Sequence, residues 1–238
     1  MTKGHLTWLY MTASQLLLGS GRRARQPSEK AERRDAIIGA AQSLVSLKQA
    51  QLPSVTAIAH KAGIAKGTIY LYFSTKEEIY LGVLGQGFAL WLAEIERALS
   101  ARNADVASFI DSYCRFCRTH PQVLYLASLS GALLERNVRE EFADEFKAGL
   151  ALAVAQAGKM IARLAPELSV AQAARKFVCS YATTIGLWQY ANPAPMIDRV
   201  LNKKGNAVLR LDFARDLRVT LYAIWDRPLH VRRRGSAR

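Results

Sequence analysis

The chain has 238 residues, half of them hydrophobic, which is enough for a buried core and excludes a disordered or collagen-like chain. Lys and Arg number 33 against 19 Asp and Glu, so the formal net charge is +14. An excess of this size is typical of proteins with an anionic partner: nucleic acid, acidic lipid or an anionic ligand. Three cysteines are too few for a disulfide framework, and no stretch approaches the ~20 apolar residues of a membrane span. We therefore expect a cytoplasmic protein with no membrane partner.

The two ends of the chain are expected to be tails. Residues 1–27 are predicted to form a poorly ordered extension, with a secretory signal or a docked amphipathic helix as the alternatives for its apolar stretch at 6–18. An arginine run at 22–25 follows that stretch. Residues 227–238 are predicted to be a basic tail, because arginines cluster again at 232–234.

Residues 28–75 are predicted to form a small domain of three helices. Pro27-Ser28 is a helix start signal, and apolar residues then recur at the three- and four-residue spacing of a helix. A second helix is predicted to start at Pro53-Ser54 and to end at Gly63, since glycine readily adopts the left-handed conformation that ends helices. A third, short helix is expected over about 65–72.

A long connecting helix is predicted over residues 76–100. Ser74 and Glu77 fit a capping box, in which the hydroxyl and the carboxylate bind free amides at the start of a helix. Three glycines, each costing about 1 kcal/mol relative to alanine, lie inside this helix: Gly82, Gly85 and Gly87. Two explanations are open for them, close packing against another helix or a soft joint that lets the helix change shape.

Residues 101–226 are expected to be a second helical domain. Prolines divide it into helices over roughly 104–119, 121–134, 138–164, 169–190 and 211–226, with a short turn at 196–201. After residue 28 the sequence has neither a sustained alternation of apolar and polar residues nor an Asn-Gly or Asp-Gly hairpin turn. The fold class we predict is therefore all-α.

The residues from Ser54 to Phe73 have the pattern of two short helices joined by a tight turn, a helix-turn-helix. In the second of these helices Ile69 and Phe73 lie four residues apart and face the core. Gly67 and Leu71 then point outward, where a bare backbone permits close approach to a phosphate-lined groove and an exposed leucine could meet a thymine methyl.

The segment 55–79 resembles the DNA-binding domain of the tetracycline-repressor (TetR) family. The matching pieces are Ile58-Ala59, Ala62-Gly63, Lys66-Gly67, Ile69-Tyr70, Tyr72-Phe73 and Ser74-x-Lys76-Glu77-Glu78. The close match covers about residues 33–85, and the rest agrees in helix number and length. The resemblance implies a transcription regulator with an N-terminal helix-turn-helix domain and a helical ligand-binding and dimerisation domain.

Nine residues are expected to contact DNA, from the resemblance and from the outward face of the second helix. They are Thr56, Ala65, Lys66, Gly67, Thr68, Tyr70, Leu71, Tyr72 and Lys76. Ala65 departs from the Ser, Thr or Arg that the family often has there. For Tyr72 and Lys76 the alternative role is to cap and pack the domain. The arginine run at 22–25 could reach a neighbouring minor groove, as homeodomain arms do.

The resemblance further implies a homodimer that binds a palindromic DNA operator and is released by a small-molecule effector. We expect dimer contacts on at least one of two apolar stripes, within 177–188 and 211–225, with an intrachain core as the alternative. An effector pocket would lie between helices. Its candidate lining residues are Trp91, Phe109, Tyr113, Phe116, Leu126, Leu129, Tyr181, Thr184 and Trp188.

Other possible sites are weaker. Cys114, Cys117 and His120 lie on one helical face and could bind a metal or sense oxidants, but two core thiols and a capping histidine are the favoured interpretation. The sequence shows no catalytic or phosphate-binding motif, so we predict no enzyme, no metal and no cofactor. The alternative function is a nucleoid-type protein that binds DNA without a ligand.

Overall fold

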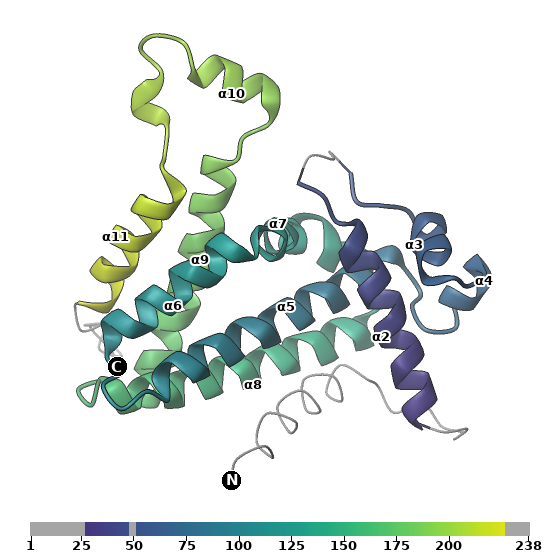
Figure 1. Ribbon diagram of the computed structural model, residues 1–238, viewed down its shortest axis with the longest axis horizontal. Coiled ribbons are helices and arrows are strands. Elements are labelled where there is room, and N and C mark those ends of the chain that lie inside the picture. The colour runs from purple at the N-terminus through teal and green to yellow at the C-terminus, as the bar shows by residue number, and fades with distance from the viewer. Residues whose placement is uncertain (1–26, 48–50, 227–238) are drawn as a thin grey trace, which may run out of the picture. The chain divides into compact units, whose positions relative to one another are not determined.

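The computed structural model describes residues 27–47 and 51–226, and every regular element within those ranges is helical (Figure 1). The all-α prediction is confirmed. Among these residues no helix is long and apolar enough to cross a membrane. The predicted tail at 227–238 and the extension at 1–27, except for Pro27, lie outside the described residues.

The helices follow the predicted order, with differences at some ends. Their bounds are α2 Pro27–Leu44, α3 Val55–Ala62, α4 Lys66–Ile69, α5 Lys76–Leu99, α6 Val106–Thr119, α7 Pro121–Leu129, α8 Glu140–Leu164, α9 Val170–Ala191, α10 Pro195–Leu201 and α11 Phe213–Trp225. A π-helical turn at Ser130–Leu134 and 3-10 turns at Glu135–Asn137 and Ala207–Leu209 complete them. The third helix, predicted over about 65–72, is shorter than expected, and the helix predicted over 121–134 changes to a π turn after Leu129.

Local capping explains where α3 and α9 begin and end. The Ser54 hydroxyl accepts a hydrogen bond from the Ala57 amide at 3.2 Å and starts α3. Gly63 ends it with a φ of 66°, the left-handed conformation predicted for this glycine. At the start of α9, Ser169 and Gln172 form a complete capping box. These signals are all local in sequence, which is why sequence patterns can find such boundaries.

The start of α5 differs from the predicted capping box by one residue. The Thr75 hydroxyl accepts from the Glu78 amide at 3.2 Å, and the Glu78 carboxylate accepts from the Ser74 amide at 2.8 Å. The prediction of Ser74 and Glu77 as the box is therefore wrong. Because the helix begins at Lys76, Thr75 occupies the capping position and Glu78, three residues later, supplies the carboxylate.

The described chain forms two compact units. The first contains the chain up to Glu94 together with Arg115–Ala153, and the second contains Ile95–Cys114 and the chain from Val154 onward. In the first unit, apolar residues of α2, α3, α4 and α5, together with Phe73 between α4 and α5, are buried and make the core; those on the helices include Ile37, Ile58, Ile69 and Leu84. Burial of such side chains stabilises the unit by about 1.5–3 kcal/mol each.

The second unit has an unusual interior because α9 buries a polar stripe. Lys176, Ser180 and Thr184 are nearly or fully inaccessible. The Lys176 ammonium donates to the Ile224 carbonyl at 2.8 Å near the end of α11, and the indole of Trp225 donates to the Ser180 hydroxyl at 3.0 Å. Burial lowers the pKa of Lys176. These bonds satisfy polar groups that would otherwise be costly inside the unit.

The two stripes considered for dimer contacts divide between interior and surface. Some members are buried, and they belong to the intrachain core: Thr184, Trp188, Leu217, Leu221 and Trp225. Phe109 of α6 packs edge-on against Trp225 at 4.9 Å between ring centroids, and Trp188 packs against Phe213 at 5.2 Å. Other residues on the same helices remain exposed and are considered below as an interface.

Two of the three glycines of α5 lie against other helices. A Cβ atom at Gly82 would come within 2.9 Å of the Ile38 side chain, and one at Gly87 within 2.7 Å of Val123. Both distances are shorter than real Cβ contacts. Close packing therefore accounts for both glycines. At Gly87 the neighbour is the stiff, β-branched side chain of Val123, whereas at Gly82 it is the flexible end of Ile38, which can turn aside at less cost.

The cysteines and His120 are placed by packing. None of the three cysteines forms a disulfide, and Cys117 is buried. His120 stacks on Phe116 at 4.2 Å, and its Nδ1 lies 2.8 Å from the Thr119 hydroxyl. It occupies the capping position before α7, as predicted, and its amide donates to the Phe116 carbonyl at 2.9 Å, but its side chain makes no capping hydrogen bond. The imidazole ring of His120 instead stacks on the buried ring of Phe116, a favourable aromatic contact. In the described ranges, no group of three His, Cys, Asp or Glu is arranged to hold a metal ion.

Candidate DNA-binding surface

The helix-turn-helix is built from α3, the turn at Gly63 and α4. Ile58 of α3, Ile69 of α4 and Phe73 just beyond are buried, so they anchor both helices to the core. The Ile64 amide donates to the Ala59 carbonyl across the turn at 3.1 Å. The predicted inward orientation of Ile69 and Phe73 is confirmed.

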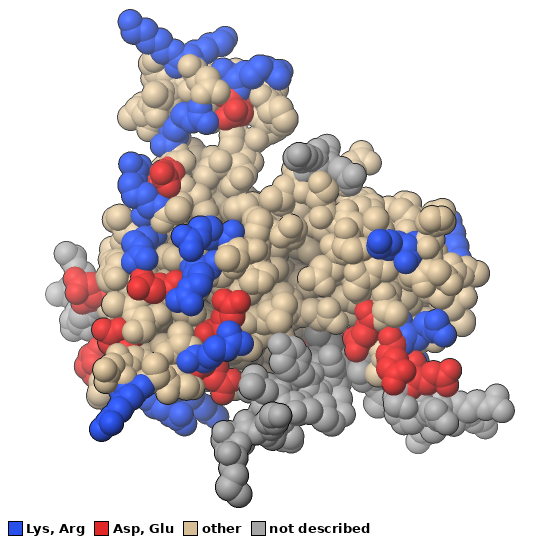
Figure 2. Space-filling view, viewed as in Figure 1, with Lys and Arg blue, Asp and Glu red and all other residues tan. Residues whose placement is uncertain are grey.

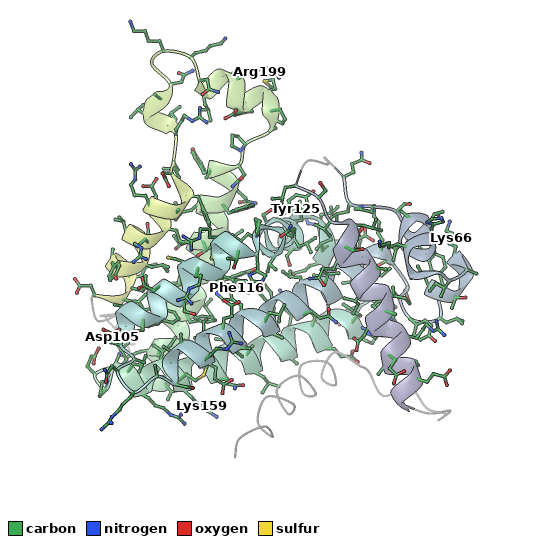
Figure 3. All side chains as sticks on the ribbon, viewed as in Figure 1. Lys66, Asp105, Phe116, Tyr125, Lys159 and Arg199 are labelled. Carbon is green, nitrogen blue, oxygen red and sulfur yellow. The ribbon has the colours of Figure 1, made fainter. Side chains whose placement is uncertain are left out.

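The opposite face of α4 and the residues after it is exposed. Lys66 and Gly67 point to solvent, Tyr70 is 50% exposed and Leu71 is 75% exposed. Figure 3 shows Lys66 at the outer edge of the α3–α4 pair. Leu71 and Tyr70 therefore present a largely exposed apolar side chain and a half-exposed aromatic one side by side in the chain, where both are available to a partner.

The other predicted DNA contacts lie around this face. Thr56 and Ala65 are exposed, whereas three are partly buried: Thr68, Tyr72 and Lys76. Ala65 occupies the capping position of α4 without a side-chain hydrogen bond. Between residues 55 and 76 the chain carries Lys61, Lys66 and Lys76 and no acidic residue. Figure 2 shows basic side chains on this part of the molecule, which suits an anionic partner.

Arg34 of α2 holds the end of the recognition segment, the residues 65–73. Its Nη1 donates to the Tyr72 carbonyl at 3.3 Å, and its guanidinium carbon lies 4.3 Å from the centroid of the Phe73 ring. Burial lowers the pKa of Arg34, an effect that the negative charges of Glu145 and Glu78 oppose. Sequence reasoning missed this residue, because its partners lie almost forty positions away along the chain.

Tyr80 of α5 holds the other end of the helix-turn-helix. Its hydroxyl donates to the Pro53 carbonyl at 2.9 Å, one residue before the cap of α3. Burial raises the pKa of this phenol, so it stays protonated and can donate. The sequence gives no local signal for this contact either, since a tyrosine on the apolar stripe of a helix suggests a core residue.

Glu78 forms a third anchor, and this one connects the start of α5 with the residue before α8. It is fully buried, and its carboxylate accepts from the Ser74 amide and from Arg139 Nε, the latter at 2.9 Å. Arg139 immediately precedes α8 and is half-exposed. A buried carboxylate requires such partners, because removing its hydration is expensive.

The predicted pocket residues fall into two groups, each packed within its own unit. In the first unit Trp91 stacks on Phe116 at 4.8 Å, and Leu126 is buried while Leu129 is partly so. In the second unit Phe109 and Trp188 are buried and Tyr181 is partly buried. The hydroxyls of Tyr113 and Thr184 lie 3.0 Å apart and share a hydrogen bond. This packing is that of a core, so a role of these residues in effector binding stays a prediction.

The described residues form helices only, and α4 follows a tight turn with one face in the core and the other exposed to solvent. These features define a helix-turn-helix regulator of transcription. The chain belongs to the tetracycline-repressor family. Residues 37–83 match the model of bacterial regulatory proteins of the tetR family, and residues 86–226 match the tetracyclin repressor-like C-terminal domain. The predicted family resemblance and the DNA-binding function are confirmed.

Similar proteins agree with this assignment. The HTH-type transcriptional regulator EthR of Mycolicibacterium smegmatis is 40% identical over 73 residues, which cover 31% of this chain and 33% of that protein. A putative TetR-family regulator of Mesorhizobium loti superimposes with a TM-score of 0.52 at 17% identity, over 82% of this chain and 96% of its own. The TetR-family regulator PfmR of Thermus thermophilus gives 0.50 at 18%, over 79% and 96%. The two structures support the fold.

Proposed function

We propose that the protein is a dimeric repressor that binds a palindromic operator in the cytoplasm and is released from it by a small-molecule effector. The observation that carries this proposal is the recognition segment. It exposes Lys66, Tyr70 and Leu71 while Ile69 and Phe73 are held in the core. A helix with this division of faces can enter the major groove without disturbing its own domain.

Each exposed group of the recognition segment has a chemical role in this proposal. Lys66 would neutralise a phosphate, and the bare backbone at Gly67 would let the helix approach closely. Leu71 would meet a thymine methyl, and Tyr70 would offer a hydroxyl to a phosphate or a base edge. The remaining contacts are assigned to Thr56, Ala65, Thr68, Tyr72 and Lys76, which surround this face.

The dimer is proposed to form through the outer faces of α9 and α11. Val178 of α9 and Val219 and Tyr222 of α11 are exposed apolar or aromatic residues on helices that also build the core of the second unit. The connection between these helices, which contains α10, exposes further apolar residues and carries a group of basic side chains, including Arg199 (Figures 2 and 3). Burying such residues against a second copy removes apolar area from water.

The effector is proposed to bind in the helical C-terminal domain, among the aromatic and aliphatic candidates named above. Several of them are tightly packed, and Tyr113 and Thr184 satisfy each other. A ligand would therefore have to displace existing contacts. That requirement is consistent with a protein whose DNA-bound and ligand-bound states differ in shape.

Selection of duplexes from random DNA, at a fixed salt concentration, tests the proposed function. A palindromic consensus with half-sites about 34–36 Å apart, or a multiple of that, would support a sequence-specific dimer. Leu71→Ala should then weaken binding to the selected duplex and relax selection at one position. A matched control is Leu152→Ala, which removes an exposed leucine from α8. Salt-sensitive binding without any consensus would favour the nucleoid-type alternative.

A further inference from the structure

Two residues at or just before the start of α8 are linked to the end of the recognition segment through bridging side chains, those of Glu78 and Arg34. Arg139, just before α8, donates from Nε to the Glu78 carboxylate at 2.9 Å, and Glu78 accepts from the Ser74 amide at 2.8 Å. The ring centroid of Phe142, in the first turn of α8, lies 5.7 Å from the guanidinium carbon of Arg34, and this guanidinium donates to the Tyr72 carbonyl. Both routes end in the backbone of residues 72–74.

These contacts join the two regions that the family models distinguish. Glu78 falls within the matched N-terminal region, 37–83, whereas Arg139 falls within the C-terminal region, 86–226. The two residues are 61 positions apart but belong to the same compact unit. The capping position of α5 is thus completed by a residue from outside the DNA-binding domain.

We propose that Arg139 is a positioning residue for DNA binding, which fixes the end of the recognition segment by orienting the buried Glu78 carboxylate. Glu78 is fully inaccessible, so it depends on the few donors that reach it. The hydrogen bond from Arg139 joins two charged groups, and such charge-assisted bonds are stronger than those between neutral groups. It holds the carboxylate toward the Ser74 amide, and the amide holds the chain directly after Tyr72 and Phe73.

The Arg139–Glu78 pair matters for DNA binding because it lies close in the chain to residues that are assigned to DNA contacts. Tyr70, Leu71 and Tyr72 immediately precede the held backbone, and all three are assigned to DNA contacts. Arg139 itself needs no contact with DNA. The loss of Arg139 should therefore let residues 70–74 sample other conformations. A smaller fraction of molecules would then be in the DNA-binding conformation, and the apparent affinity for DNA would fall by that fraction.

The test compares Arg139→Gln with Arg136→Gln, an exposed arginine of the preceding 3-10 turn whose replacement removes the same charge. Binding is measured to a duplex selected by the wild-type protein, with the fold of each variant checked by circular dichroism. Arg139→Gln should weaken binding about tenfold, as expected for the loss of one hydrogen bond to a charged group. Arg136→Gln should weaken it less than about twofold. Arg139→Lys keeps the charge but loses the paired Nε and Nη2 contacts with the carboxylate, so it should bind better than Arg139→Gln and less well than the wild type.

A second measurement separates positioning from general destabilisation. Amide hydrogen exchange in the absence of DNA should speed up about tenfold at Ser74 in Arg139→Gln, while amides of α7 in the same unit exchange as before. Faster exchange throughout the unit would indicate a merely structural role and overturn the proposal. Because this readout needs no operator, it remains decisive if the wild-type protein selects no consensus and the proposed repressor function fails.

A double-mutant cycle tests whether Arg139 acts on DNA binding through Glu78. If Arg139 acts through Glu78, then Arg139→Gln should add little to the effect of Glu78→Gln on DNA affinity. Additive effects would overturn the proposal, as would Arg139→Gln binding DNA as well as Arg136→Gln does. If Glu78→Gln does not fold, the affinity, lysine-rescue and exchange measurements on Arg139 variants still decide the question.

Discussion

Gly87→Ala is expected to destabilise the protein, although alanine is the better helix former. A Cβ at Gly87 would lie 2.7 Å from Cγ2 and 3.0 Å from Cγ1 of Val123. Because both methyl groups are too close, rotation of the valine side chain leaves at least one of them in the way. Overpacking of this kind costs about 1–3 kcal/mol, whereas replacing glycine by alanine inside a helix gains about 1 kcal/mol. The net change is a loss of about 0–2 kcal/mol.

Gly39→Ala in α2 is the matched control, since a Cβ at Gly39 would meet nothing within 4 Å. It should stabilise the protein by about 1 kcal/mol, so the two variants should differ by about 1–3 kcal/mol. Urea unfolding followed by helical circular dichroism measures the difference. Equal protein concentrations are used because the stability of the proposed dimer would depend on concentration. Combining Gly87→Ala with Val123→Ala should relieve the strain. If Gly87→Ala stabilises as much as the control does, close packing is wrong and the soft joint becomes the better explanation.

Three further predictions concern single side chains. Lys66→Gln should flatten the slope of log K for DNA binding against log salt concentration by about 0.9, the value for one lost phosphate contact, without changing the unfolding free energy. Arg163→Gln, which removes the same charge at an exposed position of the second unit, is the control. Equal slopes for the two variants would refute the contact of Lys66 with a phosphate. Tyr80→Phe should lower the unfolding free energy by about 0.5–1.5 kcal/mol, because it removes the hydrogen bond to the Pro53 carbonyl; urea unfolding with no loss would show that the bond contributes nothing. Lys176→Met tests the buried ammonium, whose pKa lies below its ordinary value of 10.5. The folded state binds this proton less well than the unfolded state does, so wild-type stability should rise relative to the variant as pH increases toward 10.5. A pH-independent difference would contradict a lowered pKa.

The sequence predicted the helix-turn-helix well because its signals are local. Ser54, Gly63 and the pair Ile69 and Phe73 act within one or two helical turns, and each is found where the pattern placed it. The exposure of Lys66 follows from the same periodicity. A contact with DNA does not, since exposure shows that a side chain is available and leaves its partner open.

The error at the start of α5 shows where local patterns stop. Ser74 with Glu77 and Thr75 with Glu78 both fit a capping box, so the sequence offers two solutions of equal quality. The structure chooses the second, in which the buried Glu78 also meets Arg139. That choice depends on a residue 61 positions away, which no pattern within the helix contains.

The stripes of α9 and α11 were ambiguous for a related reason. A spacing of three and four residues identifies an apolar face but leaves open which partner covers it. Thr184, Trp188 and Trp225 are buried within the chain, whereas Val219 remains exposed. Aromatic residues at helical spacing more often belong to a core than to a pocket, and packing places most of them in the core.

The sequence by itself determined that this chain is all-helical and carries the DNA-binding domain of its family, because periodicity, caps and the glycine turn are properties of short segments. Tertiary structure decided which polar groups are buried and what satisfies them. Arg34 with Tyr72, Tyr80 with Pro53, and Glu78 with Arg139 are each joined across at least 27 positions. Such pairs form only when packing brings separate helices together, and the packing of the whole unit selects among many pairs that the sequence allows.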